Sequence, residues 1–179
     1  MGKKWFLRNL NKNYFLNVGK KSFRCQIGSQ GLENSSKKIE GDKKTPIGKW
    51  FLVSVFYRPD RILRPKFKKK NILKINKITK LCAWCDDIRS QYYNRYLKIN
   101  NLRSPSTHHE KLWRDDEAYD IIIVVSHNFK PTIKNKGSAI FIHCSFNDYR
   151  NTAGCIAMEK KDLLFLLKNL QEKTYIKIQ

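Results

Sequence analysis

The stretch Ile121-Ile122-Ile123-Val124-Val125, followed after a turn-prone segment by Ser138-Ala139-Ile140-Phe141-Ile142, decides the fold class of this chain. Both runs are short, apolar on both faces and rich in β-branched side chains. Such runs are typical of central strands, which are buried on both sides of a sheet. The intervening segment 126–137 contains Asn, Pro and Gly, which favour turns. We therefore expect two neighbouring central strands of one sheet.

Other segments extend this sheet. The pattern predicts strands at Lys4–Leu10, Asn13–Val18, Ser22–Ile27 and Lys49–Tyr57, the last of them interior because both of its faces are apolar. One helix is expected from near Glu159 and Asp162, on the helical spacing of Leu163, Leu166, Leu167 and Leu170. Residues 60–118 show no clear periodicity. A long segment of this kind inside a compact domain more often carries functional residues than serves only as a connection. With no linker or repeat, we expect a single mainly β domain (β-rich α+β, few helices) over residues 1–179.

The chain is strongly basic, with 37 Lys and Arg against 15 Asp and Glu and a net charge of +22. Such a charge attracts polyanions, of which nucleic acid is the usual one. The cations are spread along the whole chain, however, rather than gathered in one patch. An anionic polymer of the cell envelope would be attracted by the same positive charge, so nucleic acid is not the expected partner. No run of about 18 apolar residues is present, which predicts no transmembrane segment. The basic start is followed by no apolar region, so no secretory signal is visible.

One histidine and one cysteine point to chemistry. His143 ends the second central strand, and Cys155 follows Gly154 in a turn twelve positions later. Because a free thiol is only a few per cent thiolate at neutral pH, a nucleophilic cysteine needs a base such as imidazole. Glycine before the cysteine lets backbone N–H groups approach a developing oxyanion. We predict Cys155 as nucleophile, His143 as base, and the N–H groups of Gly154 and Cys155 as oxyanion donors; the alternative is a buried structural thiol.

Three segments in this order resemble the YkuD-type L,D-transpeptidase family of bacterial cell-wall enzymes. They are Glu40-Gly41-Asp42-Lys43-Lys44-Thr45-Pro46-Ile47-Gly48-Lys49-Trp50, the strand-ending His143, and Thr152-Ala153-Gly154-Cys155-Ile156. The resemblance implies the family's mixed-sheet or sandwich catalytic domain and acyl transfer through a Cys155 thioester on peptidoglycan stem peptides, with no metal or cofactor. It also implies that a backbone carbonyl, not an acidic residue, orients the imidazole.

Further segments are similar to a proteobacterial subgroup of that family. They are Tyr57-Arg58-Pro59-Asp60-Arg61, Trp84-Cys85-Asp86-Asp87, Tyr93-Asn94-Arg95, His109-Glu110 and Leu112-Trp113-Arg114-Asp115-Asp116. Some members of the subgroup join stem peptides through the first residue of the acyl donor, which implies a 1–3 type crosslink. Ala153, Ala157 and Cys144 replace the family's usual His, Arg and Gly, and this puts the ordinary 3–3 crosslink in question. An L,D-carboxypeptidase or other hydrolase on the same fold is the alternative.

The motifs supply candidate substrate-binding side chains. Arginine binds carboxylates through two parallel hydrogen bonds, aspartates would receive a diaminopimelate amine, and aromatic rings would wall a cleft. The candidates are Arg58, Trp84, Asp86, Asp87, Tyr93, Arg95, His109, Arg114, Thr152 and Ala153. The alternative for the arginines and aspartates is structural pairing with one another, and for the aromatics a place in the core. Thr45-Pro46-Ile47-Gly48 is expected to build a turn before a strand rather than to touch substrate.

Five cysteines, at positions 25, 82, 85, 144 and 155, leave at least one thiol outside any pairing. Cys82-Ala83-Trp84-Cys85 together with His108-His109 offers a zinc site or a redox dithiol as alternatives, although a second ligand pair at finger spacing is absent. The rival hypothesis from another class is therefore a basic nucleic-acid-binding domain with a Cys/His metal site. The resemblance implies instead a monomeric enzyme of the periplasm or cell envelope.

Overall fold

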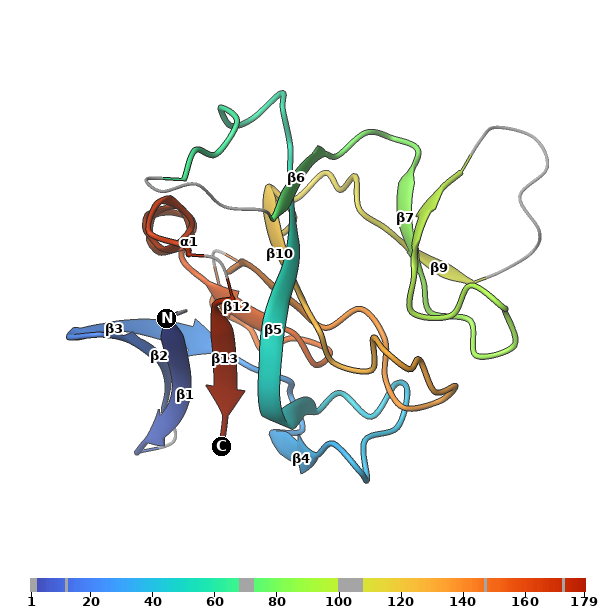
Figure 1. Cartoon of the computed structure of the whole chain (residues 1–179), viewed down its shortest axis with the longest axis horizontal. Coiled ribbons are helices and arrows are strands. Elements are labelled where there is room, and N and C mark those ends of the chain that lie inside the picture. The colour runs from blue at the N-terminus through green and yellow to red at the C-terminus, as the bar shows by residue number, and fades with distance from the viewer. Residues whose placement is uncertain (1–2, 12, 68–72, 100–107, 147, 172) are drawn as a thin grey trace.

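The computed structural model describes residues 3–11, 13–67, 73–99, 108–146, 148–171 and 173–179, and its fold is mainly β, as predicted (Figure 1). Its elements are β1 (Lys4–Leu10), β2 (Asn13–Val18), β3 (Lys21–Gln26), β4 (Leu32–Asn34), β5 (Thr45–Tyr57), β6 (Lys74–Lys77), β7 (Cys82–Cys85), β8 (Tyr96–Lys98), β9 (His109–Lys111), β10 (Ile121–Val125), β11 (Phe141–Cys144), β12 (Ile156–Met158), α1 (Lys160–Lys168) and β13 (Tyr175–Ile178).

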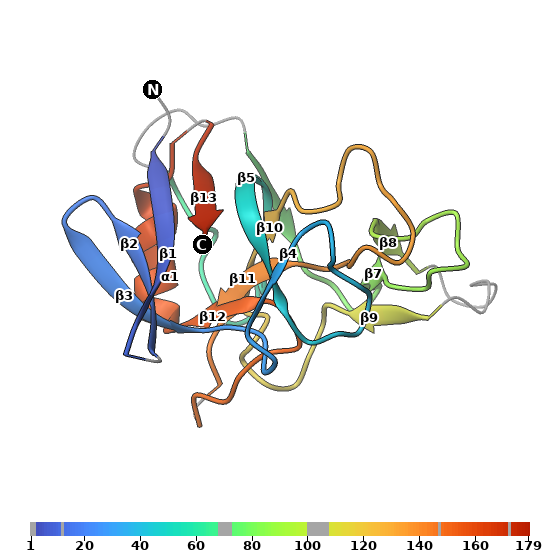
Figure 2. The same ribbon diagram turned by 90° about the horizontal axis from the view of Figure 1, so that it is seen from below.

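The large sheet closes on itself. Its strands run in the order β10-β11-β12-β3-β2-β1-β13-β5, and β5 pairs again with β10. The thirteen residues of β5 make this closure possible, because successive parts of the strand pair with β4, then β13, then β10 and β6. The interior position expected for Lys49–Tyr57 is thus confirmed. Figure 2 shows β1, β13 and β5 on one side of this closed sheet and β11 and β12 on the other.

The inside of the closed sheet is the main hydrophobic core. Trp5 and Leu7 of β1, Leu16 of β2 and Ile142 of β11 are buried there. Helix α1 adds Leu163, Leu166 and Leu167, with Leu170 just beyond its end, so the predicted leucine stripe is confirmed as a core contact. Among the described residues no helix is long and apolar enough to cross a membrane.

A second, three-stranded sheet, β8-β7-β9, stands beside the closed sheet (Figure 1). It falls in the segment 60–118, for which the sequence predicted no regular structure; each of its strands has only three or four residues, too few to show an alternation. A second hydrophobic cluster, which includes Trp84, Tyr119 and Phe141, joins the two sheets.

The second central strand begins later than predicted. We expected Ser138–Ile142, but β11 starts at Phe141, because Ala139 adopts a positive φ of 51°, which a strand does not allow. The residues before β11 therefore form a bent segment, in which the Ile140 carbonyl accepts from the Val125 N–H and the Ala139 carbonyl faces Cys155.

Gly28 lies where three segments of the chain meet. A Cβ at this position would lie 2.3 Å from the carbonyl oxygen of Lys43, so the close approach of the two backbones requires glycine. The Gly28 N–H donates to Oγ1 of Thr45 at 2.9 Å, and Gly28 also forms a parallel β-bridge with Thr152. The chain after β3 is thereby joined both to the start of β5 and to the turn before β12.

We expect Gly28→Ala to lower the free energy of unfolding by ~1–3 kcal/mol, because the new methyl group meets backbone atoms that cannot move away. Gly19→Asn is the matched control: nothing lies within 4 Å of a Cβ at Gly19, and asparagine tolerates its φ of +62°. Urea unfolding followed by circular dichroism measures both variants. A Gly28→Ala protein as stable as the Gly19→Asn protein would contradict the close packing at Gly28.

Candidate active site

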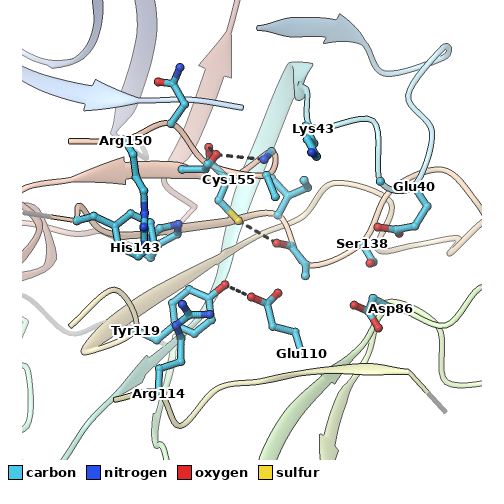
Figure 3. Close-up of a pocket in the computed structure, with 18 of the residues that line it drawn as sticks. Glu40, Lys43, Asp86, Glu110, Arg114, Tyr119, Ser138, His143, Arg150 and Cys155 are labelled. Atoms are coloured by element: carbon cyan, nitrogen blue, oxygen red, sulfur yellow. Dashed lines mark hydrogen bonds between the residues drawn. The ribbon is translucent and has the colours of Figure 1, made fainter. Parts of the chain in front are cut away.

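A cleft of about 390 Å³ lies between the end of the closed sheet and the small sheet (Figure 3). Its upper wall comes from the segments 38–43, 138–143 and 150–155, and its lower wall from Asp86, Glu110, Arg114 and Tyr119. Cys155 and His143 both line it, so the two residues expected to carry the chemistry meet in one cavity.

Cys155 is the one partly exposed cysteine in the described part of the chain; the other four are buried, and all five are free thiols. Its Sγ donates to the carbonyl oxygen of Ala139 at 3.1 Å and accepts a long bond from the N–H of Phe141 at 3.4 Å. Removal from water raises the pKa of Cys155 to about 12, with a further contribution from the negative charge of Glu110. The resting sulfur is therefore an uncharged thiol.

The imidazole of His143 is fixed in one orientation. Its Nδ1 lies 2.8 Å from the carbonyl oxygen of Cys144, and because a carbonyl can only accept, Nδ1 carries the proton and Nε2 keeps its lone pair. The rings of Tyr119 and Phe146 pack edgewise against it, with centroids at 5.3 and 6.3 Å. Burial lowers the pKa of His143 to about 4, so the ring is neutral at physiological pH. A neutral imidazole with a free Nε2 has the form that a general base requires.

The turn Thr152-Ala153-Gly154-Cys155, here called the Cys155 turn, is held from within and from outside. Within the turn, Thr152 Oγ1 accepts from the Gly154 N–H at 3.1 Å and donates to the Cys155 carbonyl at 2.6 Å. From outside, the buried Thr45 Oγ1 donates to the Gly154 carbonyl at 2.8 Å. Thr45 thus lies behind the turn and supports it. The turn expected at Thr45-Pro46-Ile47-Gly48 is wrong, however, because these residues are the first four of β5.

These bonds affect the two predicted oxyanion donors differently. The Gly154 N–H is already used by the hydroxyl of Thr152, whereas the Cys155 N–H has no partner within the described residues. In this arrangement, only the Cys155 amide of the two is available to an incoming oxyanion.

Glu110 and Tyr119 form an acid–hydroxyl pair on the lower wall. The hydroxyl of Tyr119 donates to Oε1 of Glu110, and Figure 3 shows this pair facing Cys155 across the cavity. Burial raises the pKa of Glu110 above its usual range, and burial together with the charge of Glu110 raises that of Tyr119 well above its own. The sequence drew attention to His109-Glu110 as a motif, but it did not identify Glu110 or Tyr119 as site residues.

Four of the ten predicted substrate-binding residues line the cleft: Asp86, Arg114, Thr152 and Ala153. Asp86 Oδ1 lies 2.6 Å from Nδ1 of His108, and this contact raises the pKa of His108. Arg114 holds Asp116 through two hydrogen bonds, at 2.9 and 2.6 Å. Arg114 therefore lines the cleft, as predicted for a substrate-binding residue, and it is also paired with an aspartate, as the alternative predicted.

Three further predicted residues lie behind the cleft wall and support it. Trp84 Nε1 donates to Asn94 Oδ1 at 3.0 Å, and the same oxygen accepts from the Ala139 N–H at 3.1 Å. Tyr93 donates to the carboxylate of Glu40, which lines the cleft. Arg58, stacked 3.6 Å above the ring of Trp113, donates to the carbonyl of Arg114.

The last three predicted residues do not reach the cleft. Asp87 pairs with Arg89, Arg95 lines a separate groove beside Trp84, and His109 is half-buried opposite Cys85 in the small sheet. The cleft is also lined by residues that the sequence did not identify as site residues. They are Lys38, Glu40, Lys43, Glu110, Tyr119, Phe146 and Arg150. Only the folded chain brings them together, since they come from segments distant in sequence.

The alternative metal site at the C-x-x-C motif lacks a ligand cluster. Cys82 Sγ lies 3.1 Å from the hydroxyl of Tyr96, and both Cys82 and Cys85 are buried in β7. In the part of the chain that the structure describes, no three His, Cys, Asp or Glu side chains gather around a common point.

The chain matches the model of one protein family. The YkuD family profile, described as the L,D-transpeptidase catalytic domain, matches residues 5–178. Similar solved structures include L,D-transpeptidase 1 of Mycobacterium tuberculosis (8% identity, TM-score 0.42) and an L,D-transpeptidase from Mycobacterium smegmatis (9% identity, TM-score 0.41). Each alignment covers 99% of this chain, which spans 61% and 58% of those two chains. A search among curated proteins gave no match.

The neutral thiol and neutral imidazole predict a particular pH dependence. Alkylation needs thiolate, so the rate at Cys155 should rise about tenfold per pH unit between pH 6 and 9. A preformed thiolate–imidazolium pair would instead give a constant rate over this range. Iodoacetamide labelling followed by peptide mass spectrometry measures the rate, with the denatured protein as the reference for all five cysteines. A rate independent of pH would contradict the neutral resting state.

Proposed function

Since the chain belongs to the YkuD family of L,D-transpeptidase catalytic domains, we propose that it is a peptidoglycan L,D-transpeptidase that uses Cys155 as its nucleophile. The observation that carries this proposal is the meeting of a partly exposed thiol and an imidazole with a free Nε2 in one cleft. The substrate would be a stem peptide, and the cell envelope the compartment in which it occurs.

In the acylation step, the S–H bond of Cys155 turns from the Ala139 carbonyl towards His143, and Nε2 takes its proton as Sγ attacks the donor carbonyl carbon. The C–S bond forms as the C=O π electrons move to oxygen, which gives a tetrahedral intermediate. This intermediate then collapses: the C=O bond re-forms, the C–N bond breaks, and the imidazolium gives its proton to the leaving amine. Because both groups are neutral at rest, proton transfer accompanies the attack. The Cys155 N–H stabilises the negative oxygen of the tetrahedral intermediate. The products are a Cys155 thioester and a free amine.

In the transfer step, an acceptor amine attacks the thioester. An amine is an ammonium ion at neutral pH, so it must first lose a proton, and we assign this proton to the carboxylate of Glu110, from which it passes to solvent. The amine then forms the new C–N bond as the C–S bond breaks. His143 takes the second N–H proton and returns it to the departing thiolate. The raised pKa of Glu110 makes it a stronger base than an ordinary carboxylate.

The cleft is complementary to a substrate that carries both carboxylate and ammonium groups. Lys43 and Arg114 offer partners for stem-peptide carboxylates, and Asp86 offers one for an ammonium group. Ala153 and Thr152 are small, so the wall beside Cys155 is open where the family has a histidine. These features support a donor and linkage other than the usual ones, and we propose the 1–3 type of crosslink. Attack by water in place of the amine would give the hydrolase.

The reaction is tested by incubating the protein with disaccharide tetrapeptides and analysing the products by mass spectrometry. We expect crosslinked dimers with loss of the residues beyond the cleaved bond, whereas shortened monomers alone would indicate hydrolysis. Cys155→Ala should abolish every product. Cys82→Ala and Cys85→Ala are the controls and should retain turnover, because both thiols are buried in β7 away from the cleft. Turnover by Cys155→Ala would refute the mechanism.

The role of Glu110 predicts a selective defect. Glu110→Gln should form the thioester at least as fast as the parent, because loss of the negative charge lowers the pKa of Cys155. It should transfer the acyl group about 100-fold more slowly, because the acceptor keeps its proton. Intact-protein mass spectrometry should then show accumulated acyl-enzyme, and the defect should shrink at alkaline pH, where the amine is already neutral. Glu40→Gln is the matched control, since Glu40 is also a cleft carboxylate bonded to a tyrosine. A Glu110→Gln protein without acyl-enzyme accumulation would exclude this role.

A further inference from the structure

The outer surface of β1, β13 and β5 carries cations and aromatic rings in alternation. Side chains of a strand alternate between its faces, and those that point away from the core here are Phe6, Arg8, Tyr175, Lys177, Lys49 and Phe51. We call these six residues the basic aromatic face. In Figure 1, β13 and β5 lie towards the viewer and no other element crosses them.

The strand register brings these side chains together. Lys177 lies between Phe6 on β1 and Lys49 on β5, and Tyr175 is opposite Phe51. The ammonium group of Lys49 is 4.3 Å from the ring centroid of Tyr175, and the rings of Tyr175 and Phe51 meet edgewise at 6.2 Å. Cation–π contacts hold a lysine over a ring while leaving its charge available to a ligand. Phe51 is nevertheless 50% exposed, which is high for a phenylalanine.

No acidic side chain balances this charge. Arg8, Lys49 and Lys177 form no ion pair with any described residue, whereas Lys44 pairs with Glu33 and Lys160 with Asp120. The neighbouring strand β2 continues the pattern, since Phe15 lies opposite Arg8. Unpaired cations interleaved with exposed rings are complementary to a polymer that carries both carboxylates and apolar ring faces.

We propose that the basic aromatic face binds polymeric peptidoglycan, so that the protein holds one strand of the polymer there while it acts on a peptide in the cleft. This inference rests on the proposed function. The rings of Tyr175, Phe51 and Phe6 pack against the apolar faces of the sugars, and Lys49, Lys177 and Arg8 pair with stem-peptide carboxylates.

The basic aromatic face lies away from the cleft that contains Cys155 and His143. In the closed sheet, β1 and β13 lie across from β11 and β12, which carry His143 and follow Cys155 (Figure 2). None of the six residues lines the catalytic cleft. Substitutions on the face therefore test polymer binding without altering the residues that act on the peptide bond.

Two double variants test the proposal: Lys49→Gln with Lys177→Gln removes charge, and Phe51→Thr with Tyr175→Thr removes rings while keeping strand-forming residues. Lys80→Gln with Lys98→Gln is the control, because both lysines are exposed and the same charge is removed elsewhere. Sedimentation with insoluble cell-wall sacculi measures binding, and turnover of soluble disaccharide tetrapeptides measures catalysis. We expect each face variant to bind sacculi about threefold to tenfold more weakly, with soluble turnover unchanged.

Sacculi whose carboxylates have been amidated with a carbodiimide and ammonia should also bind the parent protein more weakly, and added salt should weaken binding to untreated sacculi. Face variants that sediment like the parent would overturn the proposal. So would face variants that lose affinity for a single-stranded oligonucleotide but keep affinity for sacculi, since the face would then be a nucleic-acid surface. Failure of the proposed reaction appears separately, as a parent protein that binds sacculi through this face but leaves soluble peptides intact.

Discussion

The hydroxyl of Thr45 is the constraint on which the Cys155 turn depends. It accepts a hydrogen bond from Gly28 and donates one to Gly154, and so joins the end of β3, the start of β5 and a turn 109 residues further along the chain. A buried hydroxyl that makes both of its bonds fixes position more strongly than apolar packing does, because a lost partner leaves a polar group unsatisfied. The turn that carries Cys155 is therefore held by a side chain from outside the turn.

The motif side chains act mainly from behind the cleft. Asn94 receives bonds from Trp84 and from Ala139, and the carbonyl of Ala139 accepts the bond from Cys155 Sγ. Three successive hydrogen bonds thus connect Trp84 to the sulfur of Cys155. Such support fixes the orientation of groups that must meet a substrate within fractions of an ångström. It also explains how a bulky aromatic side chain can contribute to a site that it never touches.

The sequence predicted what depends on local pattern. Lys4–Leu10, Asn13–Val18 and Ile121–Val125 are strands with those bounds, because their alternation or apolar runs are long enough to read. The strands of the small sheet were missed, since three residues carry no period and gain their order from tertiary pairing. Glu110 and Tyr119 were missed as site residues for a similar reason: an ordinary acid and an ordinary phenol gain their altered pKa values only from burial in the folded chain.

The burial of the Cys155 sulfur affects how readily this thiol would be oxidised in an oxidising environment. Peroxide oxidises the thiolate rather than the thiol, and the raised pKa of Cys155 keeps the thiolate scarce. The four remaining thiols are enclosed in the core, where an oxidant has little access. Five free cysteines are thus compatible with an oxidising milieu, because four are buried and the thiol of the fifth, Cys155, stays largely protonated.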